Sequence, residues 1–180
     1  EMPVILGAGR LVPQKDFVTL VEAFARVRQE RPCRLVILGE GAQRGAIEAR
    51  ARTLGVADSV QLPGFVPDPA PYMRRAALFV LSSRHEGLGN VLVEALATGT
   101  PVVSTDCPSG PSEILEGGRY GRLVPPGDPV ALAAAMAEAL ADGGRGEVCP
   151  DSIGRFESSR VAEQYLRLMG LDGSREGGAS

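Results

Sequence analysis

The chain has 180 residues, which is long enough for one domain with a buried core and too short for two domains of ordinary size. Aromatic residues make up 4% and tryptophan is absent, so the core has to be built from Val, Leu, Ile and Ala. A formal net charge of −3 argues against a general nucleic-acid binder, although local basic residues could still meet a phosphate.

The cysteine and histidine content argues against a structural zinc site. Cys33, Cys107 and Cys149 are widely spaced, and His85 is the only histidine. An odd number of thiols without a pairing pattern favours a reduced, cytoplasmic setting. No apolar run approaches the roughly 20 residues that span a bilayer, and no signal peptide is visible. The abrupt start before a strand-like run suggests a fragment cut at a domain boundary.

Short apolar runs alternate with helix-like stretches along the chain. Six runs are typical of buried strands: Val4–Leu6, Arg34–Leu38, Ser59–Leu62, Leu78–Leu81, Pro101–Ser104 and Arg122–Val124. Helices are predicted over Asp16–Gln29, Arg44–Leu54, Pro69–Ala76, Val91–Thr98, Ser112–Glu116 and Pro129–Ala141. This alternation predicts an α/β fold, a doubly wound, Rossmann-like parallel sheet of about six strands. In such sheets ligands bind outside the carboxyl ends of the strands.

Capping residues and glycines mark the ends of these elements. Asp16 is a predicted N-cap for the first helix, and Gly55 closes the second. A Gly-rich break over Asp142–Gly146 precedes a final predicted helix over Ser158–Met169. We therefore expect a single domain over residues 1–169, followed by a disordered tail over 170–180.

The first candidate site follows the first strand, at Gly9 and Arg10, with Lys15 just before the first helix. Glycine lets the backbone approach a ligand closely. Arg10 and Lys15 bring two positive charges to a helix N-terminus, which already favours an anion, so a diphosphate would suit this place. In the alternative interpretation Arg10 pairs with a carboxylate and Lys15 is solvated.

The second candidate site follows the fourth strand. Asn90 can N-cap the next helix and leave backbone N–H groups around Leu88 to Val91 free to bind an anion. Glu86 stands in the loop and Glu94 lies one turn into the helix; a carboxylate accepts two hydrogen bonds and so matches a vicinal diol of a ribose or hexose. Alternatively, Glu94 complements the helix dipole and Glu86 is a solvated loop residue.

Three further segments carry weaker signals. The backbone at Phe65 and Val66 could bind a base edge, or the segment is a plain turn with a core phenylalanine. Ser109–Glu113 borders the same crevice or is structural. His85, beside Glu86, is expected to support that residue rather than act as a catalytic base.

Together these motifs resemble the family-4 glycosyltransferases. The resemblance is carried by Gly9-Arg10-Leu11 with Lys15, by Leu-Val-Ile-Leu-Gly-Glu-Gly over 35–41, by Glu86 and Glu94 with seven residues between them, and by the run 94–103. It covers about residues 3 to 142. It implies the C-terminal, nucleotide-sugar-binding half of a GT-B fold, whose N-terminal acceptor domain is absent from this chain.

The resemblance also implies roles for the matching positions. Arg10 and Lys15 would hold the donor diphosphate and stabilise the charge of the leaving group, and Glu86 would contact hydroxyls of the donor sugar. These three residues form the expected catalytic group. The expected donor-binding residues are Gly9, Phe65, Val66, Gly87, Leu88, Gly89, Asn90, Val91 and Glu94, with Glu94 on the ribose.

The function implied is transfer of a hexose or N-acetylhexosamine, with retention of configuration, from a nucleotide diphosphate sugar to a glycan or lipid-linked acceptor. The variant Asp-Cys-Pro-Ser-Gly-Pro over 106–111 resembles members that build bacterial polysaccharides, often from UDP-sugars. The resemblance implies that no metal or cofactor is needed, and the absence of an Asp-x-Asp sequence from the chain agrees with this. The full-length enzyme would be cytoplasmic, with room for peripheral association at the inner face of the membrane, and this chain alone would transfer no sugar.

Two alternatives stay open, a GT-B enzyme of other chemistry and a non-catalytic nucleotide-binding module. The first could be a sugar-nucleotide epimerase; a phosphorylase would need a lysine for pyridoxal phosphate, and Lys15 is the only lysine. Retention of Arg10, Lys15, Glu86 and Glu94 together disfavours the second.

Overall fold

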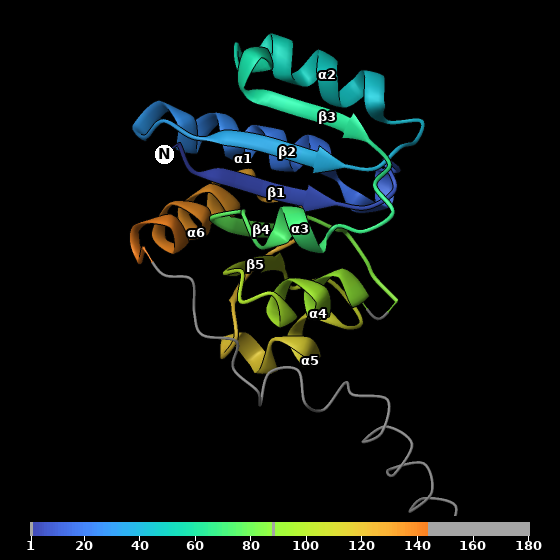
Figure 1. The fold of residues 1–180 in the computed structure, drawn as a ribbon, viewed down its shortest axis with the longest axis vertical. Helices are drawn as coiled ribbons and strands as arrows, with labels where there is room; N and C mark the ends of the chain where they lie inside the picture. The colour runs from blue at the N-terminus through green and yellow to red at the C-terminus, as the bar shows by residue number, and fades with distance from the viewer. Residues whose placement is uncertain (1, 88, 144–180) are drawn as a thin grey trace, which may run out of the picture.

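The computed structural model describes residues 2–87 and 89–143 and shows one parallel sheet of six strands (Figure 1). The strands are β1 (Val4–Ala8), β2 (Arg34–Leu38), β3 (Val60–Gly64), β4 (Leu78–Leu81), β5 (Val102–Thr105) and β6 (Arg122–Val124). Their order is β3-β2-β1-β4-β5-β6. This is the doubly wound order of a Rossmann-like fold, so the predicted fold class is confirmed.

Helices alternate with the strands. The α-helices are α1 (Phe17–Glu30), α2 (Arg44–Thr53), α3 (Ala70–Met73), α4 (Asn90–Ala97), α5 (Pro111–Ile114) and α6 (Pro129–Ala141). Short 3-10 helices are η1 (Pro13–Lys15), η2 (Ala57–Ser59) and η3 (Glu116–Gly118). Every element predicted within the described residues is present, but α3 and α5 are single turns and shorter than the ranges expected from sequence.

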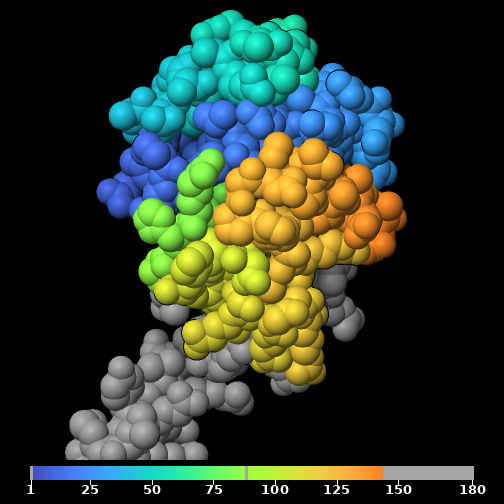
Figure 2. Space-filling view, turned by 180° about the vertical axis from the view of Figure 1, so that it is seen from behind, coloured from blue at the N-terminus to red at the C-terminus, as the bar shows by residue number. Residues whose placement is uncertain are grey.

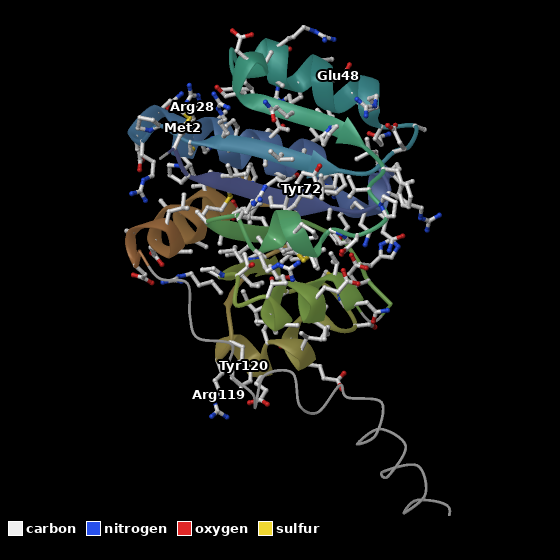
Figure 3. The ribbon with its side chains drawn as sticks, in the orientation of Figure 1. Met2, Arg28, Glu48, Tyr72, Arg119 and Tyr120 are labelled. Atoms are coloured by element: carbon white, nitrogen blue, oxygen red, sulfur yellow. The ribbon has the colours of Figure 1, made fainter. Side chains whose placement is uncertain are left out.

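The sheet separates two apolar layers because successive side chains of a strand point to opposite faces. Leu35 and Ile37 of β2 pack in the layer with α1, α2 and α6, whereas Val36 and Leu38 face the layer with α3, α4 and α5. From behind, α6 lies beside α1 on the first face (Figure 2). On the other face Tyr72 of α3 lies over β1 and β2 (Figure 3) and lines a second pocket of about 360 Å³.

Asp16 ends η1 and starts α1, as predicted for an N-cap. Its carboxylate accepts a hydrogen bond from Thr19 N at 3.4 Å, and its φ of 47° lies in the left-handed region. Aspartate tolerates this region better than most residues, because its short side chain bonds locally.

Two predicted caps differ from the structure. Asn90 is the first residue of α4 and not its N-cap; the cap is Gly89, whose φ of 75° only glycine adopts readily. The C-cap of α2 is Leu54, and Gly55 follows it with a φ of 69°. In both places the glycine takes the left-handed turn, and this shifts the cap by one residue.

Several predictions concern segments outside the described residues. The final helix over Ser158–Met169, the tail over 170–180 and most of the Gly-rich break lie there. Within residues 2–87 and 89–143, no helix combines the length and apolar character needed to cross a membrane.

Candidate functional site

A pocket of about 770 Å³ opens at the carboxyl ends of β1, β2 and β4. It lies where the strand order reverses, between β1 and β4, which is the place where doubly wound sheets bind ligands. Its lining combines backbone-rich turns with two basic and three acidic side chains. The lining residues are Ala8, Gly9, Arg10, Lys15, Leu38, Gly39, Glu40, Phe65, Val66, Pro69, Glu86, Gly89, Asn90, Val91 and Glu94.

The floor of the pocket is made by close approach of the loops after β1 and β2. Gly9 N donates to Leu38 O at 2.9 Å, and Leu11 N donates to Glu40 O at 2.8 Å. Gly39 has a φ of 134°, and a Cβ there would lie 1.9 Å from Gly9 O. Glycine at position 39 is therefore required both by its backbone angle and by its contact.

Lys15, in the loop after β1, and Glu86, in the loop after β4, form an ion pair in the pocket. Lys15 Nζ lies 2.6 Å from Glu86 Oε1, with the two side chains 17% and 6% exposed. Ser83 Oγ donates to the same oxygen at 2.5 Å. Lys15 and Glu86 thus contact each other, although the sequence analysis assigned them to the diphosphate and the sugar of a ligand. Neither side chain is simply solvated.

Further hydrogen bonds hold the same two loops together. Ser82 Oγ donates to Lys15 O at 2.8 Å, and Arg84 N donates to Gln14 O at the same distance. Gln14 Nε2 in turn donates to the His85 carbonyl at 2.9 Å. Since these contacts join the loops at several points, the positions of Lys15 and Glu86 are set jointly.

The start of α4 offers backbone donors to the pocket. Gly89, Asn90 and Val91 all line it, and Leu92 N is already bonded to Gly89 O at 2.8 Å. The amides of Asn90 and Val91 have no acceptor among residues 2–87 and 89–143. Free amides at a helix N-terminus favour an anion, so the cap correction leaves the predicted amide cluster in place.

Arg10 and Glu94 are two charged residues that line the pocket. Both are exposed, and within the described ranges neither side chain has a hydrogen-bond or ion-pair partner. Within the described residues Arg10 therefore forms no ion pair with a carboxylate, unlike in the alternative interpretation. Both side chains are available to a ligand.

Glu40 is a pocket residue that the sequence reasoning missed. Arg44 donates to both of its carboxylate oxygens, at 2.8 and 3.2 Å, and also to Leu62 O at 3.1 Å. The hydrogen bonds from Arg44 hold the pKa of Glu40 below its ordinary value. The available signal was the Leu-Gly-Glu-Gly run after β2, since polar residues at carboxyl ends converge in a parallel sheet. Ala8, Leu38, Gly39 and Pro69 were missed in the same way.

The remaining predicted positions divide into those at the pocket and those away from it. Phe65 lies at the pocket and is 74% exposed, so it is not a core residue. Gly87 and His85 are exposed and do not line the pocket, and neither does the segment 109–113. Leu88 lies outside the described residues.

The described residues include two cysteines. Cys33 and Cys107 are free and buried, and burial raises the pKa of both thiols. Cys149 lies outside the described residues. No cluster of three His, Cys, Asp or Glu side chains suited to a metal ion occurs among the residues that the structure describes.

Comparison with known proteins matches this chain to a family. The sequence model of the family described as glycosyl transferases group 1 matches residues 2–142. The lipopolysaccharide core biosynthesis glycosyltransferase LpsE of Rhizobium meliloti is 36% identical over 176 residues, which cover 94% of this chain and 50% of LpsE. A 4-alpha-N-acetylgalactosaminyltransferase of Campylobacter jejuni, acting on a diphospho-undecaprenol substrate by its name, is 38% identical over 67% of this chain and 32% of its own length.

Solved structures share the fold. The lipopolysaccharide outer core galactosyltransferase WaaB, in its apo form, superposes with a TM-score of 0.83 at 25% identity over 94% of this chain and 50% of WaaB. Anabaena Alr3699/HepE, in complex with UDP and glucose, has a TM-score of 0.84 at 24% identity, over 94% and 48% of the two chains. This chain therefore spans about half the length of these proteins, or less.

Proposed function

Because this chain belongs to the family of glycosyl transferases group 1, we propose that it is the donor-binding half of a retaining glycosyltransferase. The observation that carries the proposal is the arrangement of charges in one pocket. Arg10 and Lys15 line the pocket together with the residues that begin α4, and Glu86 and Glu94 line the same space. Basic groups and amides suit a diphosphate, while two carboxylates suit the hydroxyls on either side of it.

In this proposal the ligand runs through the pocket from base to sugar. The base lies at Phe65 and Val66, the ribose at Glu94, the diphosphate at Arg10 and Lys15, and the sugar at Glu86. When the bond from the anomeric carbon to the diphosphate breaks, negative charge develops on the leaving oxygen, and the two cations stabilise it. The acceptor hydroxyl forms the new bond on the same face, and its proton passes to the leaving diphosphate. Arg10 and Lys15 supply the positive charge without a divalent cation.

The finer assignments draw on the named relatives. UDP is the proposed nucleotide, since Alr3699/HepE is described with UDP and glucose. A hexose or N-acetylhexosamine is the proposed sugar, and bacterial polysaccharide or lipopolysaccharide synthesis the proposed setting, because LpsE is named for lipopolysaccharide core biosynthesis. The glycan or lipid-linked acceptor would bind to a second domain, in the cytoplasm or at the inner face of the membrane. Positioning both substrates requires both halves of the cleft, so we expect no transfer by this chain alone.

The test is calorimetric titration of the chain with UDP, GDP and ADP. Affinities near 1 mM correspond to only about −4 kcal/mol, so high protein concentrations are needed. We expect UDP to bind, Arg10→Ala to abolish binding, and Arg52→Ala to leave it unchanged. Arg52 is the matched control, because it is exposed on α2 and does not line the pocket. UDP binding that survives Arg10→Ala would contradict the diphosphate assignment. Addition of EDTA should change nothing.

A further inference from the structure

The carboxylate of Glu86 receives both of its donors on one oxygen. Lys15 Nζ and Ser83 Oγ lie 2.6 and 2.5 Å from Oε1. Among residues 2–87 and 89–143, Oε2 has no hydrogen-bond partner, although the side chain is only 6% exposed and lines the pocket. A carboxylate oxygen that lines a pocket and has no donor there is available to accept hydrogen bonds from a ligand.

Ser83 is itself held in place by the neighbouring strand. Its side chain is fully buried, and its backbone carbonyl accepts a hydrogen bond from the Thr105 hydroxyl at 2.6 Å. Thr105 is the last residue of β5 and is 1% exposed. Because both residues are shielded from water, the Ser83 hydroxyl keeps its direction toward Glu86.

We propose that Ser83 is a positioning residue for the donor sugar: by fixing Oε1 of Glu86 beside Lys15, it leaves Oε2 directed at the sugar hydroxyls. The inference rests on the proposed function, in which Glu86 meets the sugar. Without the Ser83 hydroxyl, the carboxylate can turn so that both oxygens share Lys15, and the oxygen that accepts from the sugar is no longer fixed.

The neighbouring Ser82 makes a different contact, so loss of the Ser83 hydroxyl should affect the sugar site specifically. Ser82 Oγ donates to Lys15 O at 2.8 Å and so fixes the backbone of the diphosphate site. Loss of the Ser83 hydroxyl leaves that contact intact. We therefore expect Ser83→Ala to weaken binding of the sugar and to spare binding of the nucleotide.

The experiment compares dissociation constants for UDP, UDP-glucose and UDP-N-acetylglucosamine in the 180-residue chain, measured by calorimetry. Ser83→Ala should weaken the better-bound UDP-sugar about 5- to 10-fold, the effect of roughly one hydrogen bond, and change UDP less than about 2-fold. Ser104→Ala is the matched control, because Ser104 is equally buried on β5 and, among the described residues, its hydroxyl donates only to Thr105 O. Thr105→Val, which removes the support of Ser83, should act in the same direction and serves if Ser83→Ala does not fold.

Equal weakening of UDP and UDP-sugars would mean a merely structural role and would overturn the inference. Unchanged UDP-sugar affinity in both Ser83→Ala and Thr105→Val would do the same, while leaving the proposed function intact. If the unaltered chain bound none of the three compounds, the proposed function would fail and this inference with it.

Discussion

Lys15 Nζ lies 2.6 Å from Oε1 of Glu86, although 71 positions separate the two residues in the chain. The contact joins the loop after β1 to the loop after β4 inside the pocket. Lys15, which we propose as a diphosphate ligand, thus already has a carboxylate partner, whereas the Arg10 side chain has none within the described residues. The two basic residues should differ accordingly when each is removed.

Lys15→Ala is expected to lower the free energy of unfolding by about 2–4 kcal/mol, because it leaves a buried carboxylate without its counter-charge. Arg10→Ala should change it by less than about 0.5 kcal/mol, since Arg10 is exposed. Urea denaturation followed by circular dichroism measures both. Adding Glu86→Gln to Lys15→Ala should restore much of the loss; no recovery in this double variant would show that the ion pair is not its origin.

Glu94→Gln should weaken binding of the nucleoside diphosphate, and His85→Ala should change it little. Glu94 lines the pocket and its side chain has no partner within the described ranges, whereas His85 lies outside the lining. Loss of a charged hydrogen-bond acceptor corresponds to about 1.5–3 kcal/mol, or roughly 10- to 150-fold in affinity. Calorimetric titration with UDP gives both values, and the reverse order would overturn the assigned roles.

Gly39→Ala should destabilise the chain by more than about 3 kcal/mol or prevent folding. The new Cβ would overlap Gly9 O at 1.9 Å, and a φ of 134° is strained for any other residue. Gly45→Ala is the control, because that glycine lies in α2 and a Cβ added to it would have no atom within 4 Å. It should gain up to about 1 kcal/mol by its better helix propensity. Similar unfolding midpoints for the two variants would refute the close approach of the loops.

Asp16→Ala should cost about 1–2 kcal/mol of stability through loss of the α1 cap. Asp16→Asn should cost less, because asparagine accepts the same hydrogen bond and tolerates the left-handed region. Arg84 Nε lies 2.9 Å from Asp16 Oδ2, but its side chain is 59% exposed, so that pair contributes little. Chemical denaturation distinguishes the two variants. If Asn costs as much as Ala, the charge toward Arg84 matters more than the cap.

Phe65→Ala should weaken UDP binding about 3- to 10-fold without loss of stability. Its ring is 74% exposed at the edge of the pocket, so little burial is lost when it is removed, whereas a base would stack on it. Parallel titration and thermal unfolding separate the effects. A fall in unfolding temperature with unchanged affinity would assign Phe65 to the fold instead.

Sequence periodicity was sufficient for the sheet because its strands are short and largely apolar, and β1, β2, β4 and β5 are buried over most of their length. β2, β4 and β6 begin and end at the predicted residues, since each apolar run is bounded by polar residues or turns. Most of the predicted site residues, though not Gly87, also line one pocket, because residues after parallel strands share one edge of the sheet.

What the sequence could not supply was contact between loops. Glu40 enters the pocket because Gly39 crosses Gly9 closely and Arg44 holds the carboxylate, and neither contact follows from periodicity. The Lys15–Glu86 pair likewise depends on the meeting of two loops. The cap of α4 was misplaced because a left-handed glycine and an asparagine stand side by side, and local propensity does not decide between them.

The strand order also has a consequence for how the chain becomes organised. The sheet consists of two halves, β3-β2-β1 and β4-β5-β6, which meet along the pairing of Ile5 with Leu78 and Leu6 with Phe79. The pocket draws on both halves, so it comes into existence only when they have docked. A molecule bound there spans the seam, and by mass action it opposes their separation. Ligand binding should therefore stabilise the contact between the two halves. Slower hydrogen exchange of the β1 and β4 amides in the presence of ligand would show this effect.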